Sequence, residues 1–406
     1  MTASLSSLLL LGVLLTTLQV LCAVPWLIVF DPSLIKTRLR NPKTLGYTLL
    51  SILGVGVVFG LLCEFNSEPK TLEGWGRIYC ALLELQLFAD FFVGVFFFLL
   101  LVWPKGGAVA LAAFREGVRQ PMFWVLGFAG FGLIGISPVL PYFTFGEDIK
   151  MLKDLGYITI MAVAALFAVL TASTAIAEEI EGRTAVTVMS KPISRRNFLI
   201  GKFLGILIAG LSMSVMLGWW LVWIILLKEW FDPQIGNETK PDPLWVLNTA
   251  SSLYSSGPAY ALTKGILLWV HEFGSVAPGL LISFCQVMVL LSIAVALATR
   301  LPMIVNAMIC LSVYFLGHLT PVLNSIALRA QDNTGQARLI YFVAQVFDYV
   351  LPNLDRFDMG PAVVRYAPLP AGLFSLYTLN VTVYALTYTT IALVFGLILF
   401  EDRDVA

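Results

Sequence analysis

The chain has 406 residues, of which 59% are hydrophobic and only 12% charged, and its formal net charge is zero. A soluble globular domain has about a quarter charged residues, so this composition excludes that class. The balanced charge also gives no general attraction to nucleic acid. The two histidines lie far apart in sequence and the five cysteines form no CxxC pair, so we predict no metal site on this chain.

Apolar runs of about 20 residues recur along the chain, each long enough for a helix to cross a bilayer. The runs are continuous, as in 91–102, whereas a membrane β-strand would alternate apolar and polar residues. Because only helices and closed barrels satisfy the backbone in lipid, we predict an all-α, polytopic helical membrane protein with about nine transmembrane helices. The predicted spans are residues 6–30, 45–63, 78–103, 122–144, 156–177, 201–227, 275–299, 303–325 and 372–400.

The distribution of lysine and arginine predicts which loops face the cytoplasm, because cytoplasmic loops are enriched in both. Segments 31–44, 104–121 and 178–202 are basic and fall on one side of the predicted arrangement. Segments 64–77 and 228–243 are acidic or balanced and fall on the other side. We therefore predict a multi-pass protein of the cell (plasma or inner) membrane, with its N-terminus outside and its C-terminus in the cytoplasm.

Two stretches outside the spans have the pattern of amphipathic helices. Residues 108–120 combine Ala110, Leu111 and Phe114 with two arginines, which predicts a short helix on the cytoplasmic membrane surface. The outer segment 326–371 has apolar residues at helical spacing, which predicts a second surface helix. Packing against neighbouring spans is the alternative interpretation of both stretches.

Polar side chains inside predicted spans are costly to bury and are candidates for function. Glu84 and Asp90 lie six residues apart in the third span and so point to different faces of one helix. They allow a proton or cation role, but a buried polar contact between helices is the favoured interpretation. Asn306 and His318 in the eighth span allow the same two interpretations, and the structural one is again favoured.

Cys63 and Cys80 fall near the outer ends of adjacent predicted spans. Their placement on one side of the membrane allows a disulfide between them, with two free thiols as the alternative.

The most informative segment is 178–205, which joins the fifth and sixth predicted spans on the basic side. Its three glutamates extend the preceding helix out of the membrane, and Pro192 ends a short helix within the segment. Ser194 is the predicted N-cap of the next helix. Gly201 and Gly205 form a GxxxG pattern, which allows close packing of that helix against a neighbour.

This segment resembles the cytoplasmic coupling loop of ABC-2-type permeases, in which an acidic–Gly–Thr stretch precedes a Ser-Lys-Pro-x-Ser-Arg-x-x-Phe-x-x-Gly-Lys run. The matching residues are Glu179, Glu181, Gly182, Thr184, Ser190, Lys191, Pro192, Ser194, Arg195, Phe198, Gly201 and Lys202. Among such permeases the chain is most similar to the copper-enzyme-maturation and gliding-motility types. In the family this loop sits in a groove of the ATPase subunit. The resemblance therefore implies coupling through Glu178, Glu179, Glu181, Gly182, Arg183, Thr184, Lys191, Pro192, Ser194, Arg195, Arg196 and Lys202.

The resemblance also implies how the chain is organised. A surface helix followed by six spans matches the family core, and three extra spans precede it. The expected parts are a three-helix bundle at 1–103, an interfacial helix at 104–121, and a permease core at 122–406 with coupling loop 178–202 and outer loops 228–270 and 326–371.

The implied function is that of the membrane permease of an ATP-driven transporter, with export commoner than import in the family. The chain has no Gly-x-x-x-x-Gly-Lys-Ser/Thr loop, so we expect no enzymatic activity and no bound cofactor, with ATP and Mg on the partner ATPase. Expected partners are two copies of that ATPase, a second permease copy or a paralogue, and the lipid bilayer. The alternatives are an ion-coupled secondary transporter that uses Glu84 and Asp90, and a non-transporting membrane scaffold for an ABC ATPase.

Overall fold

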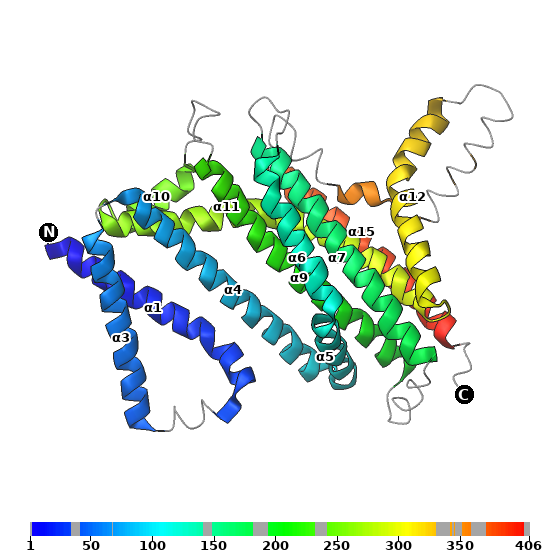
Figure 1. Cartoon of the computed structure of the whole chain (residues 1–406), viewed down its shortest axis with the longest axis horizontal. Helices are drawn as coiled ribbons and strands as arrows, with labels where there is room; N and C mark the ends of the chain where they lie inside the picture. The colour runs from blue at the N-terminus through cyan, green and yellow to red at the C-terminus, as the bar shows by residue number, and fades with distance from the viewer. Residues whose placement is uncertain are drawn as a thin grey trace. The chain divides into compact units, whose positions relative to one another are not determined.

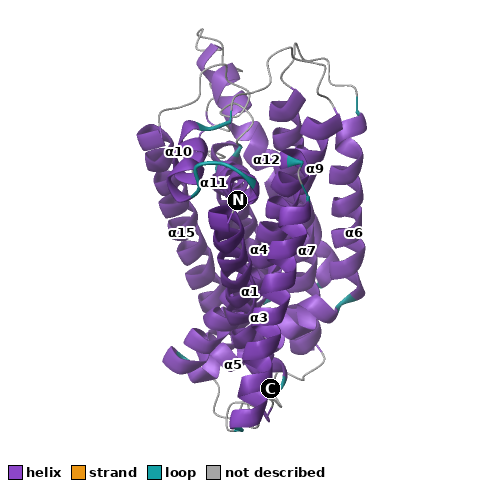
Figure 2. Ribbon diagram, turned by 90° about the vertical axis from the view of Figure 1, so that its left-hand side faces the viewer, coloured by secondary structure: helices purple, strands orange, loops and turns teal. Residues whose placement is uncertain are grey.

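The computed structural model has helices as its only regular secondary structure among the residues that it describes (Figures 1 and 2). The described residues are 2–33, 41–66, 68–140, 148–181, 194–231, 242–329, 342, 345, 351–358 and 371–401. The helices are α1 (Thr2–Phe30), α3 (Pro42–Phe65), α4 (Pro69–Val102), α5 (Pro104–Arg119), α6 (Pro121–Ile136), α7 (Asp148–Glu181), α9 (Arg195–Phe231), α10 (Leu244–Leu253), α11 (Pro258–Ala298), α12 (Met303–Arg329) and α15 (Ala371–Glu401), with short 3-10 helices η1 (Ser137–Val139) and η2 (Leu354–Phe357).

The predicted helical membrane fold is confirmed. Within the described residues, eight helices are long and apolar enough to cross a membrane, and Met303–Leu319 is a shorter apolar helix. These nine segments coincide with the nine spans expected from hydropathy. The protein is therefore a multi-pass membrane protein.

Several helices are longer than the spans predicted within them, and α4 and α11 begin furthest ahead of the predicted starts. α4 begins at Pro69 rather than at residue 78, and α11 begins at Pro258 rather than at residue 275. The added turns contain charged side chains, which lowered their hydropathy below that of a span. In the fold two of these charges, Lys264 and Glu73, are paired, since Lys264 Nζ lies 2.9 Å from Glu73 Oε1 and 2.7 Å from Asp242 Oδ2. Pairing offsets the cost of burying each charge, so the helices continue through these turns.

Proline and glycine mark the helix boundaries. Five of the described helices (α3, α4, α5, α6 and α11) begin with a proline, whose missing N–H would have no partner in the first turn. Gly257, just before α11, has a φ of 90°. That left-handed conformation is costly for residues with a Cβ, so glycine suits the turn that connects α10 to α11.

The chain divides into two compact units. Unit 1 consists of Met1–Phe98 and Pro233–Ser275, and unit 2 consists of Leu99–Asp232 and Val276–Ala406. Unit 1 thus combines the first three spans with α10 and the first half of α11, a region expected from sequence to belong to an outer loop. The outer segment 326–371 lies mostly outside the described residues, so its predicted surface helix stays a prediction.

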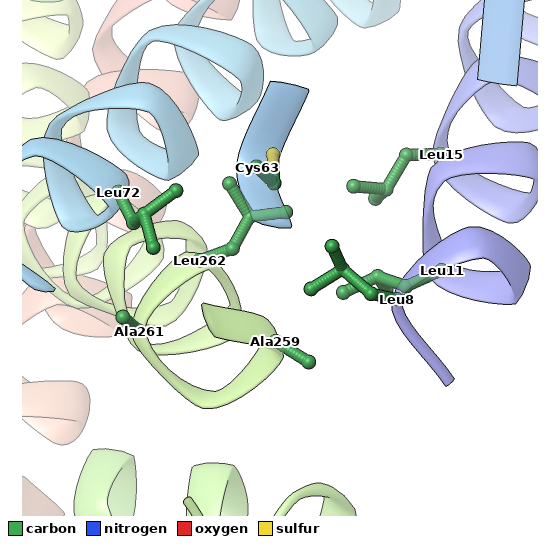
Figure 3. Close-up of a cluster of buried hydrophobic side chains, with 8 residues drawn as sticks. All are labelled: Leu8, Leu11, Leu15, Cys63, Leu72, Ala259, Ala261 and Leu262. Carbon is green, nitrogen blue, oxygen red and sulfur yellow. The ribbon is translucent and has the colours of Figure 1, made fainter. Parts of the chain in front are cut away.

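A cluster of buried apolar side chains joins four helices of unit 1 (Figure 3). Its members are Leu8, Leu11 and Leu15 of α1, Cys63 of α3, Leu72 of α4, and Ala259, Ala261 and Leu262 of α11. They come from the start of α1, the end of α3 and the starts of α4 and α11. These four helix ends therefore lie together, as the alternation of the predicted spans requires.

Glycines bring the helices of unit 1 into close contact. A Cβ on Gly56 of α3 would lie 2.6 Å from Val13 Cα of α1. A Cβ on Gly76 of α4 would lie 2.9 Å from Ile266 N of α11. Both distances are too short for a real Cβ, so the backbones approach this closely only because glycine stands there.

α9 is the central helix of unit 2 and contacts α5, α6, α7 and α15. α6, α7 and α9 run side by side, with α5 at their lower end (Figure 1). At the opposite end of α9, Lys228 Nζ lies 3.5 Å from Asp148 Oδ2 at the start of α7. The two ends of unit 2 are thus each fixed by charged contacts around α9.

Candidate functional site

The predicted coupling segment lies at the end of unit 2 where α7 ends and α9 begins. α7 continues to Glu181, so the expected extension of this helix through Glu178 and Glu179 is confirmed for the backbone. Five of the predicted coupling residues lie outside the described residues: Gly182, Arg183, Thr184, Lys191 and Pro192. Their role stays a prediction.

Ser194 is the N-cap of α9, as predicted. Its Oγ accepts a hydrogen bond from the backbone N–H of Asn197 at 3.3 Å, and its carbonyl oxygen accepts one from Phe198 N–H at 3.1 Å. A serine in this position satisfies N–H groups that have no partner within the helix. The coupling segment therefore contains the capped start of α9.

Arg195 binds the C-terminal end of α15. Its Nη1 donates hydrogen bonds to the carbonyl oxygens of Phe400 at 2.9 Å and Glu401 at 2.7 Å. The guanidinium also lies 5.7 Å from the centre of the Phe400 ring. Phe198, one turn further along α9, packs on the same ring with centroids 6.1 Å apart. Arg195 thus has an internal partner in this chain.

Arg300, in the turn between α11 and α12, binds the adjacent carbonyl group of α15. Its Nε donates to Leu399 O at 2.8 Å. The last carbonyls of a helix have no N–H partner within it and form the negative end of its dipole. Two arginines therefore satisfy three of them, and we call this group (Arg195, Arg300 and the carbonyls of Leu399, Phe400 and Glu401) the α15 clamp.

Arg196 differs from its neighbour. Its side chain is exposed and makes no hydrogen bond or ion pair with the part of the chain that the structure describes. Successive residues of a helix are separated by about 100° around its axis, so Arg195 and Arg196 cannot both face α15. The structure thus separates two residues that the sequence placed in one basic pair.

Lys202 binds the surface helix α5. Its Nζ donates to Glu116 Oε2 at 3.0 Å, and its side chain is 5% exposed whereas that of Glu116 is 43% exposed. The sequence implied for Lys202 a place in the coupling motif. In the fold its ammonium is buried beside a carboxylate that reaches solvent.

The predicted close contact through Gly201 and Gly205 is confirmed, and its partner is α5. A Cβ on Gly201 would lie 2.8 Å from Val109 Cβ, and one on Gly205 would lie 2.6 Å from Ala113 Cβ. Trp103, just before α5, donates from Nε1 to Asn197 Oδ1 at 3.2 Å. α5 and the first turns of α9 are therefore tightly packed together.

α5 itself confirms the predicted short helix, at 104–119 rather than 108–120. Its buried face differs from the expected one, because Leu111 and Phe114 are only half-buried. The buried residues are small, namely Gly106, Gly107, Ala110, Ala113 and Gly117. Close backbone contact with α9 requires small side chains at the interface, so packing decides which face is buried.

Glu84 is buried between two helices of unit 1. Its Oε2 accepts a hydrogen bond from Trp269 Nε1 of α11 at 2.6 Å. The other oxygen, Oε1, is buried without a hydrogen-bond partner among the described residues. One turn further on, Phe88 packs on Phe273 with ring centroids 5.8 Å apart. Glu84 and Phe88 thus form a continuous contact of α4 with α11.

Asp90 faces α1, not α11, which agrees with the prediction that Glu84 and Asp90 point to different faces. It lies beside the backbone of Trp26, and Tyr79 on the same helix donates to Leu15 O at 2.8 Å. Both contacts join residues separated by 64 positions, so α1 and α4 run parallel in register. The two carboxyls are therefore in separate helix interfaces and do not form one site.

Asn306 and His318 make structural contacts in unit 2. Asn306 is fully buried, and its Nδ2 donates to Ser173 Oγ and Ala294 O, each at 2.9 Å. His318 lies 3.3 Å from the Gln286 amide and 2.9 Å from Tyr314 O. Asn306 connects three helices by these bonds.

The cysteines are free thiols. Cys63 and Cys80 are both buried in unit 1 and are not joined in the structure. The disulfide that the sequence allowed is therefore not formed here.

Three contact partners at this end of unit 2 were not predicted. Arg300, Glu116 and the end of α15 are far from the coupling segment in sequence, and their contacts arise only in the fold. Weak signals exist for two of them. Arg300 is the lone charge in the turn between two spans, and Glu116 is the single acid among the cations of 104–121.

The chain was compared with known protein families. A family model described as ABC-2 family transporter protein matches residues 35–405. The match includes the second and third spans, which the resemblance of the coupling segment had left outside the family core. No curated protein sequence matches the chain. Because the family model covers nearly the whole chain, and the coupling segment lies within it, the protein belongs to the ABC-2 family of transporter proteins.

Proposed function

We propose that this chain is the membrane-spanning permease subunit of an ATP-driven exporter, coupled to a separate ATPase through segment 178–202. ABC-2 permeases are transporter components rather than enzymes and generally work with an ABC ATPase. ATP and Mg are then bound by two ATPase copies, and a second permease copy or a paralogue completes the pathway.

The observation that supports this proposal most is the arrangement at one end of unit 2. The helix that enters segment 178–202 and the helix that leaves it are both continuous with long, buried spans. α9 is in turn packed on α5 through Gly201 and Gly205 and paired with it through Lys202 and Glu116. A force applied to the segment would therefore displace α9 and α5 together.

In this mechanism, closure of the two ATPases presses on segment 178–202. α9 receives the displacement at its capped start, and α5 follows because the two helices share a close glycine contact and an ion pair. Closely packed interfaces shift between discrete arrangements instead of deforming continuously. The two permease cores would then alternate between inward-open and outward-open states.

The ion-coupled alternative requires Glu84 and Asp90 to act together as one site. The two carboxyls contact different helices, α11 and α1, and each contact is of the kind that holds helices together. We therefore favour the ATPase-coupled function. The scaffold alternative shares the ATPase partner and differs only in whether cargo moves.

Affinity purification of the tagged chain in mild detergent, with mass spectrometry and an ATPase assay on the eluate, tests the proposal. The informative variant is Arg196→Glu, because Arg196 is exposed and its side chain makes no described contact in this chain. The matched control is Lys43→Glu, an equal charge reversal at an exposed position outside the segment.

We expect an ABC ATPase to co-purify with the wild type and with Lys43→Glu, and to be reduced about tenfold or more with Arg196→Glu, as for loss of an interfacial charge contact. Recovery of a monodisperse chain without any ATPase would refute the proposal and favour ion-coupled transport. Co-purification without cargo movement in proteoliposomes would identify the scaffold function.

A further inference from the structure

We propose that α15 is a second helix moved by the coupling segment, and that Arg195 transmits the movement while Arg196 contacts the ATPase. This inference rests on the proposed function, since it assumes an ATPase that acts on segment 178–202. It assigns different roles to two adjacent arginines.

The first step is the position of Arg195 along the chain. It is the first residue of α9 and follows the N-cap Ser194 directly. Within the coupling segment, Ser194 is the first described residue after Glu181, and it is bonded directly to Arg195. Any displacement of Ser194 is therefore passed to the Arg195 backbone.

The second step is the rigidity of the contact with α15. One guanidinium nitrogen binds two successive carbonyl oxygens at 2.9 and 2.7 Å, while the side chain lies against the Phe400 ring. A planar guanidinium with several fixed donors holds its acceptors in one orientation, which a lysine ammonium does not. Arg195 and Phe400 thus form a contact that resists sliding.

The third step is the second arginine of the α15 clamp. Arg300 binds Leu399 O at 2.8 Å from the turn between α11 and α12. The end of α15 is therefore held between the start of α9 and the end of α11. Movement of α9 relative to α11 must either move α15 or break one of these contacts.

The fourth step is the exposure of Arg196. It has no described partner in this chain, and it lies within segment 178–202, which is expected to bind the ATPase. A carboxylate on the ATPase would supply the negative partner that the Arg196 guanidinium lacks among the described residues of this chain. Arg196 is thus available for docking, whereas Arg195 is committed to α15.

The test follows α15 in the full chain purified with its ATPase. Spin labels at Leu376→Cys on α15 and Ile136→Cys on α6 occupy exposed positions within unit 2. Cys22, the one cysteine that is not buried, is replaced by serine. The distance between the labels is measured without nucleotide and with ATP plus vanadate, in the wild type, Arg195→Gln, Arg195→Lys and Arg196→Glu.

We expect a nucleotide-dependent distance change in the wild type. It should be lost in Arg195→Gln and partly restored in Arg195→Lys, while both Arg195 variants retain the ATPase. Arg196→Glu should lose the ATPase itself. If Arg195→Gln does not yield monodisperse protein, Arg300→Gln replaces it, and a reduced distance change with retained ATPase is expected.

The failures are distinguishable. Absence of the ATPase from the wild type refutes the proposed function. An ATPase-bound wild type without any distance change at α15, or an unchanged distance response in Arg195→Gln, refutes the transmission role. Loss of the ATPase from Arg195→Gln would show that Arg195 is a docking residue and would refute the division of roles.

Discussion

Arg195 donates a hydrogen bond to the carbonyl oxygen of Phe400 across 2.9 Å, although the two residues are 205 positions apart in the chain. One belongs to the first turn of α9 and the other to the last turn of α15. The contact joins the helix that follows the coupling segment to the final span of the protein. It explains why a residue that matches the family's coupling motif is not simply an external docking charge.

The contact of α9 with α5 predicts a difference between two glycines of the same helix. A Cβ at Gly205 would meet α5 at 2.6 Å, whereas the nearest atom to a Cβ at Gly210 is 3.9 Å away. Gly205→Ala should lower the free energy of unfolding by about 1–3 kcal/mol through overpacking. Gly210→Ala should be neutral or stabilising, because alanine is the better helix former by about 1 kcal/mol.

Detergent-titrated unfolding followed by tryptophan fluorescence measures both glycine variants against the wild type. Equal stability of Gly205→Ala and Gly210→Ala would contradict the close contact of α5 with α9.

The ion pair of Lys202 with Glu116 predicts a non-additive effect. Glu116→Gln removes the carboxylate 3.0 Å from a lysine side chain that is only 5% exposed. Leaving a buried cation without its anion should cost about 1–3 kcal/mol, less than for a fully buried pair because Glu116 reaches solvent. Adding Lys202→Met should recover part of this loss, since no buried charge then remains.

A double-mutant cycle on thermal stability in detergent measures this coupling. The prediction fails if the double variant is less stable than Glu116→Gln alone.

The contact of Glu84 with Trp269 predicts that a neutral hydrogen-bond acceptor at position 84 is enough to keep the protein stable. Glu84→Gln keeps an oxygen that can accept from Trp269 Nε1 and adds no charge, so stability should change little. Glu84→Ala removes the acceptor and side-chain volume at a buried position. It should cost about 1–2 kcal/mol, the upper range for polar contacts between membrane helices.

Thermal stability and ATPase-driven activity of both Glu84 variants are compared in proteoliposomes. Full loss of activity in a stable Glu84→Gln protein would show that an ionisable carboxyl is required, as in the ion-coupled alternative.

The packing of α4 on α11 predicts a second matched pair of glycine substitutions, in unit 1. A Cβ at Gly76 would lie 2.9 Å from Ile266 N, whereas a Cβ at Gly74 would meet nothing within 4 Å. Gly76→Ala should lower the melting temperature through overpacking at the backbone, and Gly74→Ala should not. Size-exclusion chromatography after heating the tagged chain measures both, and equal melting temperatures would contradict the contact.

The sequence by itself determined the class and the spans of this protein, and it indicated the ABC-2 family that the family model shows. Long continuous apolar runs satisfy their backbone in lipid as helices, so hydropathy located the eight long apolar helices and the shorter one at Met303–Leu319. The N-cap at Ser194 and the close helix contact at Gly201 and Gly205 were also predicted from sequence, because caps and glycine spacings depend on residues only a few positions apart. The helix starts at Pro69 and Pro258 were not predicted, because Glu73 and Lys264 in those turns are paired only through contacts between distant parts of the chain.

The tertiary structure alone decided what each polar side chain binds. Arg195 and Arg196 are adjacent basic residues, and only the presence of α15 beside Arg195 gives the two side chains different contacts. Glu84 and Trp269 are 185 positions apart, and nothing local relates them. A hydrogen bond or ion pair depends on a distance of about 3 Å between particular atoms, which local sequence patterns do not specify for residues on different helices.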